Sequence, residues 1–474
     1  MGIEINRTTF GTTDFERFGR RLAQETRILC AQIDKGQCAE GAFVAGFELE
    51  AWLLDRHSLP YPINDEYLAR LDTPLVVPEL SKFNVELNCT PQPLRAGALQ
   101  RLETELTATW DRCLQAARDL EGSIVAIGTL PTIRERDLCL ANISPLNRYY
   151  ALNEQVLKSR GGRPIRIRID GRENLALDHN DVMLEAAATS FQVHLQVPAS
   201  QIVRHYNASA ILSAPLVAAT ANSPFLLGHD LWDETRIPLF EQSVDAGDPT
   251  ENHRHRVTFG RRYLESSPVE YFSENLREFP VLLPMTYDDA PEAMRHLQLH
   301  NGTIWRWNRL LLGFNTDRAP QFRIEHRVMP AGPSIIDMIA NAALYIGAAH
   351  HLACRDRAPE SALDFQDART NFYAAARHGL SAELTSLDGR RTDARTLLLE
   401  EIVPMARAGL SDLGIAEDER DRYLDLISAR VRSGQNGAAW QRAHAAHHGH
   451  DYEKLVADYL AHQRSAMPVH EWEV

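Results

Sequence analysis

Four short stretches of the chain alternate apolar and polar residues with a period of two. They cover residues 47–50, 84–88, 191–197 and 322–328. A β-strand sends successive side chains to opposite faces, so each stretch can bury its apolar residues and present its polar residues together. If the four strands join one sheet, its polar face carries Glu48, Glu50, Glu86, Asn88, Gln192, His194, Gln196, Arg323, Glu325 and Arg327. The pattern therefore predicts a sheet with one buried face and one chemically active face.

The residue types on that polar face indicate a binding site. Carboxylates suit hard cations such as Mg²⁺ or Mn²⁺, an imidazole is better tolerated by Mn²⁺, and guanidinium groups suit phosphate or carboxylate. Crowded carboxylates repel one another unless a cation neutralises them. One alternating stretch with a glutamate is most often only a half-exposed strand. The prediction depends on four stretches that repeat the same chemistry.

Length and composition allow a large core and disfavour a polyanionic partner. The chain has 474 residues, 44% of them hydrophobic, which suggests two or three domains or one large domain with insertions. Its net charge of −14 argues against a nucleic-acid surface and favours small ligands. Six cysteines without a CxxC pair indicate a reduced environment, and no stretch of about 18 uncharged apolar residues occurs. We expect a cytoplasmic protein that binds neither nucleic acid nor membranes; its oligomeric state stays open.

Helical periodicity marks the elements that could support the sheet. Apolar residues recurring every three or four positions predict helices over residues 99–120, 203–221 and 335–352. A glycine or proline follows the first two helices, and Ser334 is a suitable N-cap for the third. A short apolar strand is expected at 124–127. These elements are predicted to form scaffold.

The remaining segments show less regular patterns. Residues 142–181 are expected to form loops or a hairpin. Residues 228–284 show little periodicity and are expected to form loops, whose arginine-rich part fits a solvated loop or, less simply, a phosphate-facing lid. Beyond about residue 358 the chain is predicted to be helical. We therefore divide it into a sheet-bearing part, 1–357, and a helical region, 358–474, packed on it. Four histidines near the end fit either a metal site or, more simply, an exposed alanine-rich helix end: His444, His447, His448 and His450.

Several motifs, in order, resemble the glutamate–cysteine ligase type 2 family of carboxylate–amine ligases. The resemblance begins with Gly46-Phe47-Glu48-Leu49-Glu50, followed by Glu79 and the segment 84–91. It continues through 191–197, the Asn-Ser-Pro turn within 221–228, Arg236, 303–309 and 324–327. It covers the chain from about Gly46 to Leu352. Asn308 stands where an aspartate is common, and His229 where a basic residue is common.

The resemblance implies a fold like the glutamine synthetase catalytic domain. We expect an α+β protein with a curved, mainly antiparallel sheet and helices on its outer face. This catalytic domain would span 1–357, with the helical C-terminal region 358–474 beside it. The period-two stretches independently predict such a sheet.

The resemblance also implies roles for individual residues. Two or three Mg²⁺ or Mn²⁺ ions would be held by Glu48, Glu50, Glu86, His194 and Glu325, with Glu79 as an extra ligand. Arg327 would meet the transferring phosphoryl group, with Glu325 and Arg309 as its catalytic partners. Nucleotide or anionic substrate would contact Arg236, Asn222, Gln192, Gln196 and Arg323.

The expected activity is ATP-dependent amide formation through an acyl phosphate. The resemblance implies a glutamate donor, hence a γ-glutamyl bond as in glutathione biosynthesis, whereas the amine acceptor stays open. Neither a Walker-type loop nor a GxGxxG loop after a strand occurs, so nucleotide binding must depend on metal and strand residues. Two alternatives are a non-catalytic nucleotide or amino-acid binding protein and a metal-dependent hydrolase.

Overall fold

The four alternating stretches are strands of one antiparallel sheet in the computed structural model, which describes residues 4–247 and 255–474. The sheet curls into an open half-barrel with the strand order β13-β14-β8-β1-β3-β2. Its strands are β1 (Val44–Leu54), β2 (Val76–Pro78), β3 (Asn84–Asn88), β8 (Phe191–Val197), β13 (Asn308–Phe314) and β14 (Pro320–His326). β4 (Gln92–Pro93) and β5 (Ser123–Val125) also pair with β1. The predicted curved antiparallel sheet is confirmed.

The strand register places the predicted polar residues on one face. Residues directly opposite in an antiparallel pair share a face. Glu50 lies opposite Glu86, Glu325 lies opposite His194, and Glu48 lies opposite Gln192. The alternate residues are apolar and buried, among them Phe47, Leu49, Leu87, Leu195 and Ile324. The sequence pattern therefore gives the correct face for each of these side chains.

Long helices cover the apolar face of the sheet. They are α3 (Ala98–Asp119), α5 (Ile202–Thr220) and α9 (Ile335–Cys354), and they confirm the three predicted helices. α5 packs against β13 and β14, α9 packs against β8, and α3 contacts α9. The Ser334 hydroxyl accepts a hydrogen bond from the Asp337 backbone N–H, as an N-cap should. Because α5 and α9 are buried almost all round, their apolar content is high.

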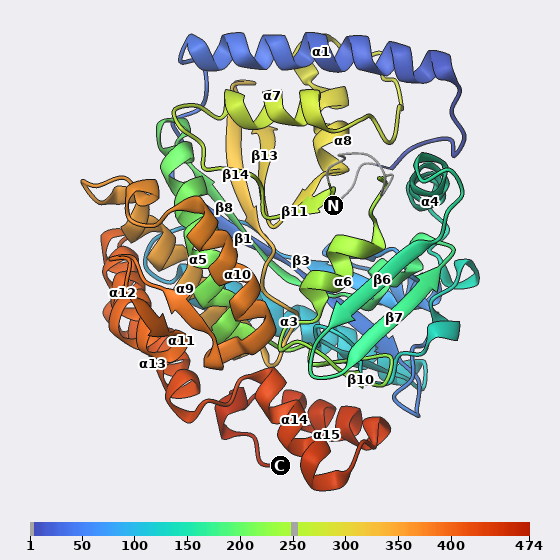
Figure 1. Ribbon diagram of the computed structural model, residues 1–474, viewed down its shortest axis with the longest axis vertical. Helices are drawn as coiled ribbons and strands as arrows, with labels where there is room; N and C mark the ends of the chain where they lie inside the picture. Colours follow the sequence, from blue (N-terminus) through green and yellow to red (C-terminus); the bar gives the residue numbers. More distant parts are fainter. Residues whose placement is uncertain (1–3, 248–254) are drawn as a thin grey trace.

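Further helices and a hairpin lie on the side of the polar face. α1 (Thr12–Asp34) lies at one end of the molecule above α7 (Val269–Glu278) and α8 (Arg295–Gly302) (Figure 1). α4 (Asn147–Ser159), the hairpin of β6 (Ile165–Asp170) and β7 (Asn174–His179), and α6 (Arg236–Ser243) complete this side. The expected hairpin within 142–181 is confirmed, but α4 was not predicted. The expectation of loops over 228–284 is wrong for α6 and α7, since helices this short depend on tertiary burial more than on local periodicity.

The C-terminal region is helical, as predicted, with one small hairpin. α14 and α15 lie at the end of the molecule opposite α1 (Figure 1). The helices are α10 (Phe365–His378), α11 (Ala394–Leu397), α12 (Val403–Asp412), α13 (Glu417–Ser433), α14 (Gly437–His448) and α15 (Tyr452–Arg464), and the hairpin is β15 (Glu383–Thr385) with β16 (Arg391–Asp393). α12 and α13 pack on α9, and the domain division at residues 357 and 358 stays a prediction.

The remaining short elements connect these layers. They are α2 (Asn64–Leu71), β9 (Phe225–Leu226), β10 (His229–Asp230), β11 (Val257–Thr258) and β12 (Trp305–Arg306). Among the described residues, no helix is both long and apolar enough to cross a bilayer.

Candidate active site

A cavity of about 370 Å³ opens over the polar face of the sheet. Strand carboxylates and arginines form its floor, and α4, α6 and α8 contribute to its walls. Of the residues predicted for the site, those lining it are Glu48, Glu50, Glu79, Glu86, Gln192, Arg309, Arg323, Glu325 and Arg327. Residues far apart in sequence therefore share one basin.

Three potential metal ligands meet at the centre of the sheet. Glu48, His194 and Glu325 come from the adjacent strands β1, β8 and β14. His194 Nε2 lies 3.3 Å from Glu48 Oε1 and 4.0 Å from Glu325 Oε2, and one ligand atom from each residue lies within 4.8 Å of the others. Ligand atoms about 2.1 Å from one octahedral ion lie about 3 to 4.2 Å apart, so this set fits a shared divalent ion. Two carboxylates with an imidazole suit Mn²⁺ or Mg²⁺.

Two arginines converge on the buried Glu325 carboxylate. Arg309 Nη2 lies 2.7 Å from Glu325 Oε2, and Arg327 Nη1 lies 3.2 Å from Oε1. Burial alone would raise the pKa of Glu325, but Arg309, Arg327 and His194 together hold it below its ordinary value. Arg327 lies one residue beyond the end of β14, where its backbone N–H donates a hydrogen bond to the Trp307 backbone carbonyl. Glu325 therefore stays ionised.

A second group of carboxylates has too little positive charge around it. Burial, with the nearby Glu86 charge, raises the pKa of Glu50 to about 7. Burial and the Glu48 charge raise the pKa of Glu86 to about 8. Burial and the Glu50 charge raise the pKa of Glu79, which follows β2. A cation bound here would restore these groups to their ionised form.

Three charged residues at the cavity were not predicted. Glu185 lies in the 3₁₀ helix Val182–Ala187, and burial, with the charges of neighbouring glutamates, raises its pKa well above the ordinary value. Arg148 on α4 and Arg295 at the start of α8 also line the cavity. None of the three belongs to an alternating stretch, so the period-two signal could not identify them.

Four predicted site residues do not line the cavity: His194, which lies against Glu48 and Glu325, and three predicted binding residues. Gln196 shares the polar face but lies at its periphery, opposite Arg323. The Asn222 amide donates to the Ala331 carbonyl and the Tyr459 hydroxyl, each at 2.8 Å, and accepts from Gln441 at 2.9 Å. Asn222 is thus fully engaged in joining α14 and α15 to the loop before α9.

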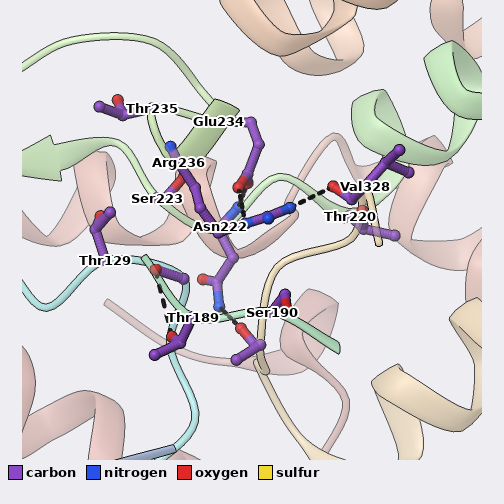
Figure 2. Close-up of polar contacts among 12 residues, drawn as sticks. Thr129, Thr189, Ser190, Thr220, Asn222, Ser223, Glu234, Thr235, Arg236 and Val328 are labelled. Carbon is purple, nitrogen blue, oxygen red and sulfur yellow. Dashed lines mark hydrogen bonds and ion pairs between the residues drawn. The ribbon is translucent and has the colours of Figure 1, made fainter. Parts of the chain in front are cut away.

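Arg236, the third, lies beneath the site rather than in it. Figure 2 shows it beside Glu234 and directed toward the Val328 carbonyl. Its Nε lies 3.0 Å from Glu234 Oε1, and its Nη2 donates to the Val328 carbonyl at 2.6 Å. Val328 directly follows Arg327, so this buried pair supports the segment that carries Arg327.

The Gln192 amide lies within the site. It donates to Glu50 Oε1 at 2.9 Å, and the Ser190 backbone N–H donates to Oε2 of the same carboxylate at 2.6 Å. These bonds hold Glu50 in place against the adjacent strand. Arg323 is exposed at the rim of the cavity, where a charged ligand can reach it.

Comparisons with known proteins give a consistent result. The model of the glutamate–cysteine ligase family 2 matches residues 44–458. A glutamate–cysteine ligase structure from Francisella tularensis, in complex with AMP, is 12% identical with a TM-score of 0.57, over 91% of this chain and 90% of that one. A bifunctional glutathione synthetase from Pasteurella multocida is 11% identical with a TM-score of 0.53, over 93% of this chain and 55% of that one. No curated protein matches in sequence.

Proposed function

The chain belongs to the glutamate–cysteine ligase family 2, and we propose that it is an ATP-dependent ligase that joins a carboxylate to an amine. The observation that carries this proposal is the meeting of Glu48, His194 and Glu325 at the floor of a cavity that Arg309 and Arg327 also line. Carboxylates for divalent cations and guanidinium groups for phosphoryl oxygens are the parts that phosphoryl transfer requires.

The strand carboxylates would bind the cations that accompany the nucleotide. Glu48, His194 and Glu325 are the candidate ligands of one Mg²⁺ or Mn²⁺ ion, and Glu50, Glu79 and Glu86 would hold a second or third. Such ions would neutralise the negative charge that spreads over the phosphoryl oxygens during transfer. The raised pKa values of Glu50 and Glu86 support this assignment, because these groups have too few cations around them in the protein alone.

The arginines would bind the anionic parts of the substrates. Arg327 and Arg309 approach Glu325 from two sides, which orients both guanidinium groups before any ligand arrives. A planar fork at Arg327 suits the transferring phosphoryl group, and Arg309 suits phosphate or carboxylate. Arg236 would act indirectly by holding the Val328 carbonyl.

The cavity also has room and surface for a nucleotide. Phe240, Val244 and Trp305 give part of its wall an apolar character suited to a flat base. Gln192 and Arg323 line the same cavity and are candidate contacts to polar groups. The solved relative from Francisella tularensis holds AMP, which supports nucleotide use here.

We propose glutamate as the donor, which would make the product a γ-glutamyl amide. Its γ-carboxylate would receive the phosphoryl group, and the resulting acyl phosphate would be attacked by the amine with loss of phosphate. The acceptor would be an amine, with cysteine, another amino acid, a simple amine or a peptide terminus as the candidates. Its pocket depends on packing and one or two polar contacts.

The decisive test combines product release with trapping of the intermediate. Purified protein with ATP, Mg²⁺ or Mn²⁺, glutamate and a panel of amines should release ADP and phosphate in step with an amide identified by mass spectrometry. Hydroxylamine in place of the amine should give a glutamyl hydroxamate. Metal-dependent cleavage of an amide without ATP, in which water and not an amine is consumed, would indicate a hydrolase instead. Nucleotide binding with no ADP across the panel would indicate a binding protein.

A further inference from the structure

A second cluster of metal-binding side chains lies in the helical layer on the other side of the sheet. It consists of His205 on α5 with His350 and Cys354 on α9. One ring nitrogen of each histidine and the Cys354 sulfur all lie within 4.8 Å of one another. His350 and Cys354 are four residues apart and so share one face of α9, and α5 packs beside α9. The cluster is separate from the cavity described above.

His205 is arranged as a metal-bound histidine is. Its side chain is 0% exposed, and its Nδ1 lies 3.0 Å from the Gln201 backbone carbonyl. That carbonyl accepts a hydrogen bond from Nδ1–H, which places the unshared pair on Nε2. Nε2 is buried and has no hydrogen-bond partner among the described residues. Burial lowers the pKa of His205 to about 4, so the ring is neutral at physiological pH and able to coordinate.

The other two residues complete a mixed nitrogen and sulfur set. The Cys354 sulfur lies 3.7 Å from His350 Nδ1 and 3.8 Å from His350 Nε2, so both ring nitrogens already lie close to the sulfur. The Phe43 ring packs on both imidazoles, with centroids 5.4 Å from His205 and 4.8 Å from His350. An apolar wall thus shields one side of the cluster.

The opposite side is open to solvent. Cys354 is exposed and lines a surface cavity of about 1070 Å³, through which an ion can enter. Burial raises the pKa of the Cys354 thiol, with the Asp412 carboxylate adding to the rise and the Arg204 guanidinium opposing it. The thiol therefore stays protonated until a metal ion displaces its proton.

We propose that His205, His350 and Cys354 bind a Zn²⁺-class transition-metal ion, with a water molecule in the remaining position. Two imidazoles and one thiolate suit Zn²⁺ or Co²⁺ and are poor ligands for Mg²⁺. On binding, the Cys354 thiol loses its proton to solvent, and its sulfur forms the new bond to the metal. The ion would tie the C-terminal end of α9 to α5.

Cobalt titration tests this site separately from the active site. Full-length protein, freed of metal by chelation and kept reduced with a phosphine, is titrated with Co²⁺. We expect a near-ultraviolet thiolate-to-cobalt charge-transfer band whose full intensity corresponds to one cysteine-bound Co²⁺ per chain and which disappears when Zn²⁺ is added. The group of Glu48, His194 and Glu325 contains no sulfur, so Co²⁺ bound there cannot give this band.

Variants identify the ligands. Cys354→Ser, at an exposed position that tolerates the change, should abolish the band, and His350→Gln should weaken Co²⁺ binding at least ~10-fold. Cys139→Ser, a matched change at a partly buried cysteine outside the cluster, should keep the band. A wild-type protein without the band, or a band that survives Cys354→Ser, would overturn the proposal.

Discussion

Glu325 is the residue at which the charges of the candidate active site meet. It is fully buried, it contacts two arginines, and its carboxylate lies 4.0 Å from His194. A carboxylate in this position can orient both guanidinium groups and still offer an oxygen to a cation. The arginine contacts that keep Glu325 ionised would lose their anion if Glu325 were replaced by a neutral residue.

Removing the charge of Glu325 should disable the proposed reaction without unfolding the protein. Glu325→Gln keeps the size of the side chain but loses a cation ligand and the anion that orients Arg309 and Arg327. We expect kcat for ADP release to fall at least ~100-fold. Circular dichroism should show a folded protein, with a melting temperature lowered by the loss of the anion between two buried arginines.

The matched control lies on the surface. Glu383→Gln makes the same change at a strand glutamate whose side chain is 79% exposed. It should leave kcat unchanged. Near-wild-type ADP release by Glu325→Gln would count against the role assigned to Glu325.

The geometry of Arg327, rather than its charge alone, should be required. Arg327→Lys keeps the positive charge but loses the planar fork and the stacking over Phe240, whose ring centroid lies 5.2 Å from the guanidinium carbon. We expect kcat to fall by a factor on the order of 100, with KM for ATP changed less. Arg391→Lys, at an exposed strand arginine, is the control and should leave kcat unchanged. A mild effect at Arg327 would assign that residue to the scaffold.

At the scale of elements, the pairing of β1 with β3 concentrates negative charge. Glu50 and Glu86 face each other directly across this strand pair, and Glu79 follows the next strand. Like charges opposite each other destabilise a strand pair. The sheet tolerates them here because the protein keeps some of these groups protonated or, as we propose, binds cations.

This arrangement predicts how stability depends on pH and Mg²⁺. The folded-state pKa values of Glu50 and Glu86 are raised to about 7 and about 8, so the folded protein binds more protons than the unfolded chain above the ordinary pKa. Stability of the metal-free protein should therefore fall as pH rises from about 5 to about 8, by up to ~1.4 kcal/mol per pH unit for each titrating group. Saturating Mg²⁺ or Mn²⁺ should reduce this fall.

Thermal melting across this pH range, with and without Mg²⁺, measures the effect. Glu86→Gln should flatten the metal-free profile because it removes one of the titrating groups. A melting temperature that responds neither to pH nor to Mg²⁺ would contradict a metal-dependent acidic cluster.

At the scale of the whole molecule, the C-terminal helices are fastened to the layer behind the sheet by buried polar contacts. Arg430 on α13 forms a buried ion pair with Asp337 on α9, with Nη2 2.7 Å from Oδ1. The other Asp337 oxygen accepts bonds from the Ser334 hydroxyl and the Val469 backbone N–H. Asn222, which joins α14 and α15 to the same layer, belongs to this group of contacts.

Loss of Arg430 should therefore weaken the whole fold. Arg430→Met leaves the Asp337 carboxylate buried without its cation, and we expect the free energy of unfolding to drop by about 3–5 kcal/mol. Denaturant titration measures this. Arg390→Met removes an exposed ion pair with Asp388 and should cost less than about 1 kcal/mol. Equal, small effects would show that the C-terminal helices are held by apolar packing alone.

Local periodicity accounts for what could be predicted about the fold. A strand alternates its side chains and a long helix repeats every 3.6 residues whatever surrounds them, so β1, β3, β8, β14, α3, α5 and α9 were predictable. Helices α4, α6 and α7 were not, because short helices are stabilised by what they pack against. The long helix α1 was not predicted either, although its length would have allowed it. Local periodicity also did not identify Glu185, Arg148 and Arg295, because these residues reach the cavity from short helices.

The amino-acid sequence by itself determined which side chains share a face of each strand, since backbone geometry imposes that alternation. Only the tertiary structure decided that β1, β8 and β14 are neighbours, so that Glu48, His194 and Glu325 lie within 4.8 Å of one another. It also decided that Asn222 and Arg236 support the site from outside the cavity. Strand order and the packing of distant segments depend on long-range contacts, which no local pattern records.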